Sequence, residues 1–255
     1  MIYFGTSGFS YDDWVGNFYP LGMPKREWLI YYAREFDACE LNATFYALPK
    51  PSVMNAMVEK TGEGFLFSIK AYQGMTHQRE DNAAVFEAFR QTLEPVIAAG
   101  KLGCILAQFP YSFKLNRGNW DYLKCFKERM AGLPVVIEFR NVQWLRSEVF
   151  GWLRQLELGF CCVDEPPLPN LLPPVAEATD KIGYVRLHGR NSAKWWQHEQ
   201  AYERYDYSYT PQELEEWLPR IRKLESMSLR TFVFANNHWR GQAVGTIRQL
   251  RKMLD

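Results

Sequence analysis

The chain has 255 residues, of which 47% are hydrophobic and 23% charged, and 30 Lys and Arg residues balance 29 Asp and Glu residues to a net charge of +1. This composition excludes a disordered chain, and no apolar run approaches the roughly 20 residues of a membrane span. A net charge near zero gives no overall attraction to nucleic acid or anionic lipid, although it does not exclude a local basic cleft. Residues 1–6 lack the basic and apolar regions of a signal peptide, and the five cysteines, an odd number, include several in apolar runs. We therefore expect a reduced, cytoplasmic protein with no membrane partner.

Eight short apolar runs, each rich in β-branched or aromatic residues, predict β-strands. The runs are continuous rather than alternating in hydrophobicity, which is typical of parallel strands covered on both faces. The predicted strands are Ile2–Gly5, Ala38–Leu41, Phe65–Ile69, Cys104–Ala107, Val135–Phe139, Phe160–Val163, Gly183–Leu187 and Thr231–Ala235.

Helical patterns lie between these runs. Apolar residues recur with helical spacing in 29–36, 85–96, 120–130, 153–156 and 244–254, and a capping box at Thr210 to Glu213 predicts a helix that continues over Leu214–Leu224. Eight strands alternating with helices predict an α/β fold of the TIM (β/α)8 barrel type, in a single domain over residues 1–255. An open doubly wound sheet is the alternative, but no G-x-G-x-x-G motif follows the first strand.

Two segments depart from this regular alternation. Five of the 14 prolines lie in residues 166–174, after the sixth strand, so the sixth helix is expected to be missing or late. The loop after the seventh strand, residues 189–209, is long and holds six tryptophans and tyrosines. Long ordered loops on a barrel usually shape its functional site.

All eight predicted strands become polar at their carboxyl ends, where (β/α)8 barrels carry their sites. The candidate residues, in chain order, are Thr6, Ser7, Glu40, Asn42, Lys70, His77, Gln108, Glu138, Arg140, Asp164, Arg186, His188, Arg190, Asn236 and Asn237. Side chains alternate along a strand, so residues two apart are expected to share a face; such pairs are Glu40 with Asn42, Glu138 with Arg140, and Arg186 with His188.

An inward-facing ring of such charges would be costly to bury unless the charges pair with one another or meet a ligand. In the first case, pairs such as Glu138–Arg140 or Glu40–Lys70 would form buried salt bridges that cap the barrel. In the second case, which we favour, the strand ends form a ligand site.

These residues also lie within motifs that resemble the domain-of-unknown-function-72 family, which is also called the YecE-like family. The resemblance runs in order through Gly5–Trp14, Phe18–Pro20, Glu40–Tyr46, Phe67–Lys70, Thr76–His77, Gln108–Pro110, Glu138–Arg140, Tyr184–Arg190 and Phe234–Asn237. It covers essentially the whole chain and implies a TIM-barrel fold. The family's fold is similar to that of endonuclease-IV-like barrels, which suggests nucleic-acid or phosphoester chemistry by analogy of fold alone.

The leading hypothesis is an enzyme that acts on a phosphorylated or otherwise anionic small molecule. Arginine provides a bidentate fork for phosphate or carboxylate and lysine provides a point charge; the candidates are Lys70, Arg140, Arg186 and Arg190. Glu40 or Glu138 would be the general base, and His77 or His188 the general acid. The polar candidates at the other strand ends would bind the ligand: Thr6, Ser7, Asn42, Gln108, Asp164, Asn236 and Asn237. No cofactor and no resident metal are predicted, and the oligomeric state is left open.

Three alternatives use the same residues. The first is a metal-dependent phosphodiesterase or nuclease of the endonuclease-IV type, with one divalent metal held by Glu40, Glu138, Asp164, His188 and His238; four histidines are too few for a three-metal site. The second is a glycosidase, but Glu40 and Glu138 lie on strands two and five, whereas the familiar barrel glycosidases use strands four and seven. The third is a non-catalytic nucleic-acid-binding module in which Trp195 and Trp196 stack on bases. The same aromatic residues would otherwise cover the mouth of the barrel.

Overall fold

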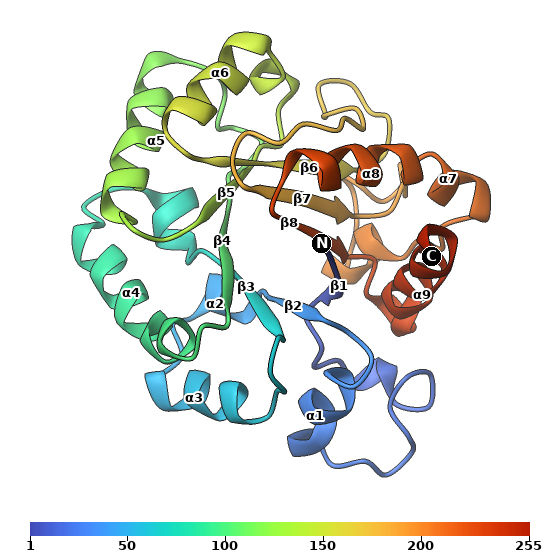
Figure 1. Cartoon of the computed structure of the whole chain (residues 1–255). Coiled ribbons are helices and arrows are strands. Elements are labelled where there is room, and N and C mark those ends of the chain that lie inside the picture. Colours follow the sequence, from blue (N-terminus) through green and yellow to red (C-terminus); the bar gives the residue numbers. More distant parts are fainter.

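The computed structural model describes residues 1–255, apart from the side chain of Ala201. Eight parallel strands follow one another in sequence order around a closed barrel, in which β1 pairs with β2 on one side and with β8 on the other (Figure 1). This arrangement confirms the predicted TIM (β/α)8 barrel. The strands are β1 (Ile2–Ser7), β2 (Ala38–Leu41), β3 (Leu66–Lys70), β4 (Leu102–Gln108), β5 (Val135–Glu138), β6 (Gly159–Asp164), β7 (Ile182–Leu187) and β8 (Arg230–Ala235).

Helices surround the strands, as Figure 1 shows, and their apolar faces pack on the barrel. They are α1 (Trp28–Tyr32), α2 (Ala43–Tyr46), α3 (Pro51–Glu59), α4 (Ala83–Ala98), α5 (Arg117–Arg129), α6 (Ser147–Gln155), α7 (Pro211–Glu215), α8 (Leu218–Met227) and α9 (Gln242–Leu254). In the described part of the chain, none of these helices has the length and hydropathy needed to cross a membrane.

All eight predicted strands are present, and the helices differ from expectation in three places: α2 and α3 were not predicted, and one predicted helix is divided. Helix α3 was missed although apolar residues recur in it with helical spacing, at Val53, Met54, Met57 and Val58; of these only Met54 is buried. The helix predicted over Leu214–Leu224 is divided into α7 and α8. Pro219 lies in the first turn of α8, and its missing N–H and fixed φ favour a new helix start rather than a continuous helix.

The proline-rich segment after β6 contains no helix among its described residues, as predicted. Leu171 and Leu172 are its buried anchors, with 5% and 2% exposure. The backbone N–H of Leu172 donates to the carboxylate of Glu165, at 3.0 Å. The two buried leucines and this hydrogen bond fix the proline-rich segment, which has no helix, at the carboxyl ends of the strands.

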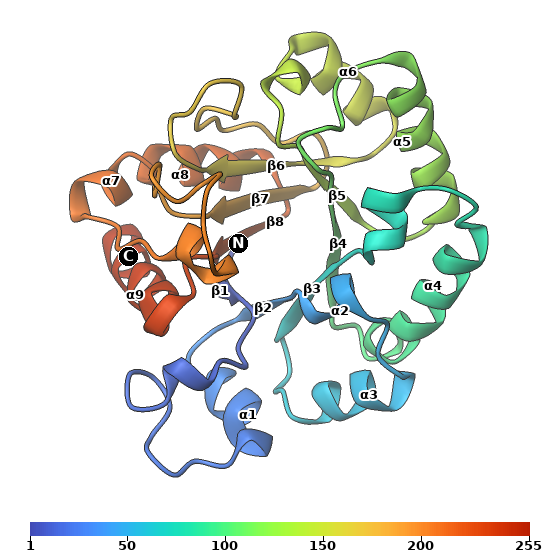
Figure 2. The same ribbon diagram turned by 180° about the vertical axis from the view of Figure 1, so that it is seen from behind.

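Residues 189–209, which we call the cover segment, follow β7 and lie near the strand ends; Figure 2 shows them in orange. The segment begins at Gly189, whose φ is +91°, in the region that favours glycine. Its Trp195 is 1% exposed, and the Trp195 and Tyr205 rings lie 6.3 and 6.2 Å from the His188 ring. The cover segment therefore packs over the polar end of the barrel.

We expect Gly189→Ala to destabilise the protein more than Gly132→Ala does. Both glycines have positive φ, which costs other residues about 1–2 kcal/mol. A Cβ at Gly189 would lie 2.7 Å from the Tyr207 Cβ, whereas a Cβ at Gly132 would have no neighbour within 4 Å. Urea unfolding should show a further loss of about 1–3 kcal/mol for Gly189→Ala. Equal losses in the two variants would contradict tight packing at the start of the cover segment.

Candidate functional site

A buried ion network crosses the interior of the barrel below its mouth. Arg186 of β7 lies between Glu40 of β2 and Glu138 of β5, and these side chains are at most 2% exposed. The guanidinium donates twice to Glu40, from Nε at 2.9 Å and from Nη2 at 2.6 Å, and its Nη1 donates to Glu138 at 2.6 Å. Tyr184 also donates to Glu40, at 2.7 Å. A bidentate pair of this kind fixes the geometry of both partners.

The network keeps its charges because its members neutralise one another. Burial by itself would raise the pKa of Glu138, but Arg140, Arg186 and His188 hold it well below its usual range. Burial would likewise lower the pKa of Arg186, but Glu138 and Glu40 raise it well above its usual value. Opposite charges at short range favour the charged forms of both partners, so Glu138 and Arg186 are ionised at neutral pH.

Arg140 connects this network to the mouth of the barrel. Its Nη2 lies 2.8 Å from Glu138 and its Nη1 lies 3.0 Å from Glu165, and its side chain is 11% exposed. Burial raises the pKa of Glu165 to about 7, although Arg140 acts against this. Glu138 and Arg140 thus share a face of the barrel, as alternation predicted.

His188 lies on the other side of Glu138. Its Nε2 is 3.0 Å from Glu138, and the Asn236 amide donates to its Nδ1 at 2.9 Å. Burial and the neighbouring Arg140 and Arg186 lower the pKa of His188 well below its ordinary value, so the imidazole is neutral and carries its proton at Nε2. His188 is fully buried and does not line the cavity described next.

Above the network lies a cavity of about 300 Å³, which we call the mouth cavity. Its lining combines cations, aromatic rings and a histidine, and no Asp or Glu is among the described residues that line it. The lining residues are Phe45, Tyr46, Lys70, His77, Gln108, Pro110, Tyr111, Arg140, Leu171, Trp195, Trp196, Arg204 and Tyr205.

Lys70 and His77 both line the mouth cavity, and both contact the Phe45 ring. The Lys70 Nζ is 4.4 Å from the centre of the Phe45 ring, and the His77 ring meets the Phe45 ring edge-on at 4.9 Å. Burial, followed by the proximity of Arg186, lowers the pKa of Lys70 to about 7. Burial and Lys70 lower the pKa of His77 to about 4, so its imidazole is neutral at pH 7. His77 lies on a single π-helical turn, Gly74–Gln78, an irregularity that often occurs at functional sites.

The cover segment brings Arg204 into the lining of the mouth cavity. The Arg204 guanidinium lies 5.3 Å from the Trp195 ring, and Arg140 lies 5.8 Å from the same ring. The Nε of Arg204 is buried and has no hydrogen-bond partner among the described residues. Arg204 was not among the predicted site residues, nor was Glu165. The length and aromatic content of residues 189–209 could have indicated that Arg204 belongs to the site.

Three of the predicted site residues lie away from the barrel interior. Thr6 points outward, where its hydroxyl contacts Tyr32 of α1 at 2.9 Å, and only the next residue, Ser7, faces Arg186. Asn42 does not share the face of Glu40. Strand β2 ends at Leu41 and Asn42 has helical backbone angles, so strand alternation no longer applies to it.

The third is Asn237, whose amide donates outward to the Tyr207 carbonyl and to the Thr246 hydroxyl. Of the other predicted residues, Gln108 remains at the mouth cavity, and its amide donates to the Phe109 carbonyl at 2.7 Å.

Asp164 and Arg190 form a separate cluster at the base of the cover segment. Arg190 donates to both Asp164 oxygens, at 3.0 and 2.7 Å, while Tyr209 and Trp217 each donate to Asp164 at 2.7 Å. The two residues line a second cavity, of about 260 Å³, together with the proline-rich segment. Four donors satisfy this carboxylate, so the cluster anchors the cover segment.

The residues of the metal-site alternative do not assemble into one ligand set. Glu40 and Glu138 are engaged by Arg186, Asp164 lies in the cluster of Arg190, and His238 stacks on Tyr11 with ring centres 4.5 Å apart. In the described part of the chain, no group of three or more His, Cys, Asp and Glu side chains has a geometry that could hold a metal ion.

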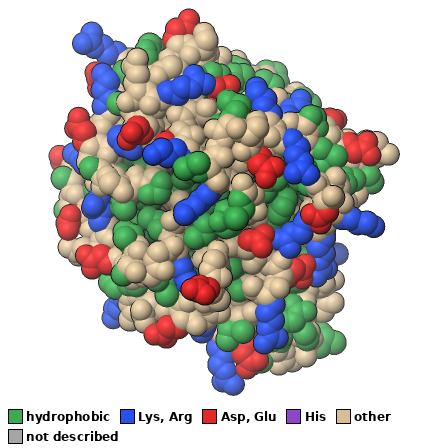
Figure 3. Space-filling view, viewed as in Figure 1, with side chains coloured by type: hydrophobic (Ala, Val, Ile, Leu, Met, Phe, Trp, Pro, Cys, Tyr) green, Lys and Arg blue, Asp and Glu red, His purple; other side chains and the backbone are tan. Residues whose placement is uncertain are grey.

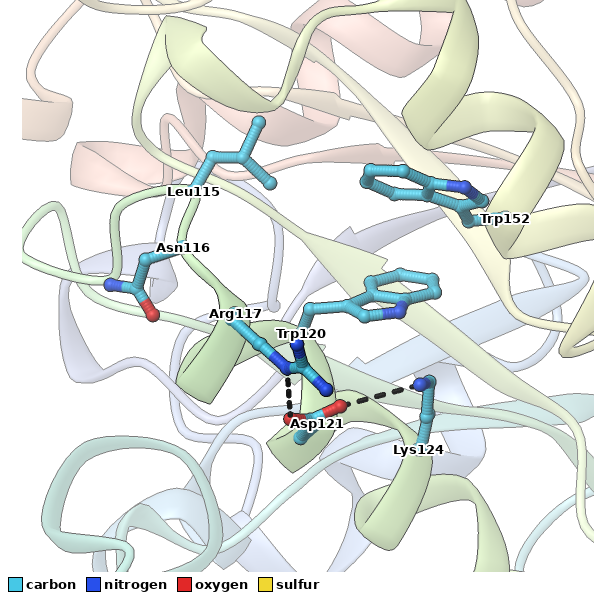
Figure 4. A pocket seen from close by; sticks show the side chains of 7 residues that line it. All are labelled: Leu115, Asn116, Arg117, Trp120, Asp121, Lys124 and Trp152. Carbon is cyan, nitrogen blue, oxygen red and sulfur yellow. Dashed lines mark hydrogen bonds and ion pairs between the residues drawn. The ribbon is translucent and has the colours of Figure 1, made fainter.

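A larger groove lies on the outside of the barrel, between α5 and α6. Figure 4 shows Trp120 and Trp152 beside each other above Asp121, which pairs with Arg117 and Lys124. This groove measures about 420 Å³, but its ion pairs are exposed and it does not include a carboxyl end of a strand. The chemistry-bearing residues are therefore concentrated at the mouth cavity.

Fold and site together define a (β/α)8-barrel protein with a charged cavity at the carboxyl ends of its strands. The sequence pattern of the family described as "Protein of unknown function DUF72" matches residues 3–255, and the chain belongs to this family. The UPF0759 protein YunF of Bacillus subtilis is 33% identical over 277 aligned residues, which cover 100% of this chain and 95% of YunF. The UPF0759 protein YecE of Escherichia coli K12 is 35% identical over 116 residues, which cover 44% of this chain and 39% of YecE.

Solved structures of the family have the same fold. A DUF72 family protein of Thermotoga maritima is 37% identical and superposes with a TM-score of 0.92, covering 100% of this chain and 99% of that one. A DUF72 family protein of Enterococcus faecalis is 26% identical, with a TM-score of 0.88 and coverage of 100% and 95%.

We expect Glu138→Gln to lower the free energy of unfolding by about 3–5 kcal/mol, because Arg186 and Arg140 lose a buried partner. Glu35→Gln, which removes the exposed partner of Arg248, should cost less than about 1 kcal/mol. Urea unfolding at neutral pH measures both losses. The Glu138 carboxylate has a lowered pKa, so its stabilisation should disappear only as the pH falls below 4.5. A loss no larger than that of Glu35→Gln would contradict the role of Glu138.

We also expect Lys70→Met to change how stability depends on pH. Between its folded pKa of about 7 and the ordinary value of 10.5, the unfolded chain holds a proton on Lys70 that the folded protein has released. The wild-type free energy of unfolding therefore gains a contribution that rises with pH across this window, and Lys70→Met should remove it. Unfolding curves at several pH values measure the effect, with the exposed Lys252→Met as the control. Identical pH profiles in wild type and Lys70→Met would disprove the lowered pKa.

Proposed function

We propose that this protein is an enzyme that binds a small molecule carrying phosphate or carboxylate in the mouth cavity. The observation that supports this most directly is the lining of the cavity, in which Lys70, Arg140 and Arg204 face a space without a lining carboxylate. Neither carboxylate partner of Arg140 lines this cavity: Glu138 belongs to the buried network, and Glu165 lines the second cavity beside the proline-rich segment. Such a lining favours an anion, and a volume of about 300 Å³ fits a small molecule.

The cations would bind the anionic group together. Arg140 is held in place by Glu138 and Glu165, and a pre-positioned guanidinium loses little freedom when it binds an anion. Arg204 has a buried, unpaired Nε that an anion oxygen could accept from. The aromatic rings of Phe45, Trp195 and Tyr205 would exclude water from the remainder of the ligand.

The chemistry would fall to the titratable groups of the cavity. His77 is neutral at pH 7 and lines the cavity, which suits a group that accepts or donates a proton. Glu138, Glu40 and His188 lie below, where they hold Arg186 and Arg140 in position. We therefore assign these three a positioning role rather than contact with the substrate.

Binding of nucleic acid is less well supported. Trp195 is buried, and Lys194 and Arg190 are paired with carboxylates of the cover segment and its surroundings. On the one face of the molecule that Figure 3 shows, basic and acidic side chains are interspersed. A sequence-independent binder needs a basic groove that follows the phosphate backbone.

A thermal-shift panel tests the proposed function. It would contain inorganic phosphate, phosphosugars, nucleotides and short oligonucleotides, each with EDTA or with a divalent metal. We expect a small phosphorylated compound to stabilise the protein in EDTA, by about 2.7 kcal/mol at 100 times its Kd. Arg204→Met should weaken this stabilisation at least about tenfold in Kd, which corresponds to the loss of one charge-assisted contact.

Arg117→Met is the matched control, because Arg117 is exposed on α5 and away from the cavity. Stabilisation that is equal in wild type and Arg204→Met would contradict binding in the mouth cavity. Stabilisation only by oligonucleotides, or only in the presence of metal, would favour the nucleic-acid or phosphodiesterase alternative.

A further inference from the structure

Lys70, like Arg204, lacks the ion pairs that hold Arg140 and Arg186 in place. Its Nζ forms no ion pair and no hydrogen bond with any described residue, and it lies over the face of Phe45, 4.4 Å from the ring centre. Arg140 and Arg186, in contrast, each contact two carboxylates. The terminal amine of Lys70 is thus free to meet whatever enters the mouth cavity.

The surroundings of Lys70 disfavour its ammonium form. The charged groups that act on it are Arg186 and Arg140, which lower its pKa, and Glu138 and Glu40, which raise it. Because Arg186 already neutralises much of both carboxylates, burial and the two guanidinium groups prevail. A lysine that is desolvated next to cations is a nucleophile at neutral pH, since part of it carries a free lone pair.

His77 supplies a proton-transfer group that lines the same cavity as this amine. Its ring and the Lys70 Nζ both contact Phe45, and both residues line the mouth cavity. The Nδ1 of His77 lies 2.9 Å from the Thr76 hydroxyl, which fixes the ring, and its Nε2 has no recorded protein partner among the described residues. A neutral imidazole in this position can take a proton from one atom and return it to another.

We propose that Lys70 is a nucleophile that forms an imine with a small aldehyde or ketone bearing a phosphate or carboxylate. Imine formation at Lys70 rests on the proposed function, because Arg140 and Arg204 would bind the anionic group and bring the carbonyl carbon to the amine. The geometry points to this substrate class because a free amine, a proton-transfer group and anion-binding cations surround the same cavity.

The reaction balances without any further reactant. The Nζ lone pair attacks the carbonyl carbon, the C–N bond forms, and the carbonyl oxygen takes a proton to become a hydroxyl. Nζ loses one proton to give the neutral carbinolamine, the hydroxyl takes a second proton and leaves as water, and the iminium nitrogen that results releases its remaining proton. The product is a C=N bond and one water, with His77 transferring the protons between nitrogen and oxygen.

Borohydride trapping tests this inference on the full-length protein. Pyruvate, dihydroxyacetone phosphate and glyceraldehyde 3-phosphate are each incubated with the protein at neutral pH, sodium borohydride is added, and peptides are analysed by mass spectrometry. We expect a reduced, stable adduct on the peptide that contains Lys70 with at least one of these compounds. Inorganic phosphate should compete with adduct formation.

Two variants make the result specific. Lys70→Arg keeps the positive charge but removes the nucleophile, so it should lose the adduct and still be stabilised by anions. Lys101→Arg is the control, because the Lys101 Nζ already donates to the Val58 and Thr61 carbonyls and to the Thr61 hydroxyl. Its adduct yield should equal that of the wild type.

A second measurement does not depend on the choice of carbonyl compound. Trinitrobenzenesulfonate is an anionic reagent that labels neutral amines, and at neutral pH it should label Lys70 on the order of tenfold or more faster than exposed lysines. Labelling of Lys70 no faster than exposed lysines would overturn the inference. So would an adduct yield in Lys70→Arg equal to that of the wild type.

Failure of imine formation and failure of the proposed function have different signatures. If anions stabilise the wild type but Lys70 shows neither an adduct nor rapid labelling, the inference is wrong and the anion site stands. If anions neither stabilise the protein nor compete with labelling, the proposed function is also wrong.

Discussion

The buried pairing of Arg186 with Glu40 and Glu138 is the interaction on which the rest of the site depends. It joins side chains from β2, β5 and β7 across the interior of the barrel, where none of the three is more than 2% exposed. Burying these charges is costly unless all of them are paired, so the loss of one partner would leave an uncompensated charge. The network therefore holds the floor of the mouth cavity in one arrangement, and Arg140 and His188 are oriented through Glu138.

This pairing also decides which cations remain available to a ligand. Arg186 is saturated by carboxylates, and Arg140 is fixed by Glu138 and Glu165 at the edge of the cavity. Lys70 and Arg204 have no ion pair with any described residue, and they line the cavity from β3 and from the cover segment. The self-paired cap, which the sequence presents as one of two alternatives, is thus present, and above it lies the cavity in which we propose that a ligand binds. The cap pairs its charges, and the lining above it leaves cations exposed to the cavity.

The same arrangement accounts for the unusual state of Lys70. A lysine near two glutamates would ordinarily keep its proton, but Arg186 and Arg140 already occupy these carboxylates. The positive guanidinium groups and the desolvation of the cavity then lower the pKa of the amine. A structural salt network can in this way prepare a neighbouring nucleophile without contacting the substrate, which is how lysines are activated in other buried sites.

The sequence by itself determined the barrel, because eight β-branched and aromatic runs alternating with helical patterns leave few other folds, and it determined that charges gather at one end. It also indicated that Glu138 and Arg140 share a face. Only the tertiary structure decided the ion pairs and the lining of the cavity. Glu40 pairs with Arg186 rather than with Lys70. Asn42 does not follow the strand alternation because β2 ends before it, and Arg204 reaches the cavity from a distant loop. Pairing across a barrel depends on register and loop path, which local periodicity does not encode.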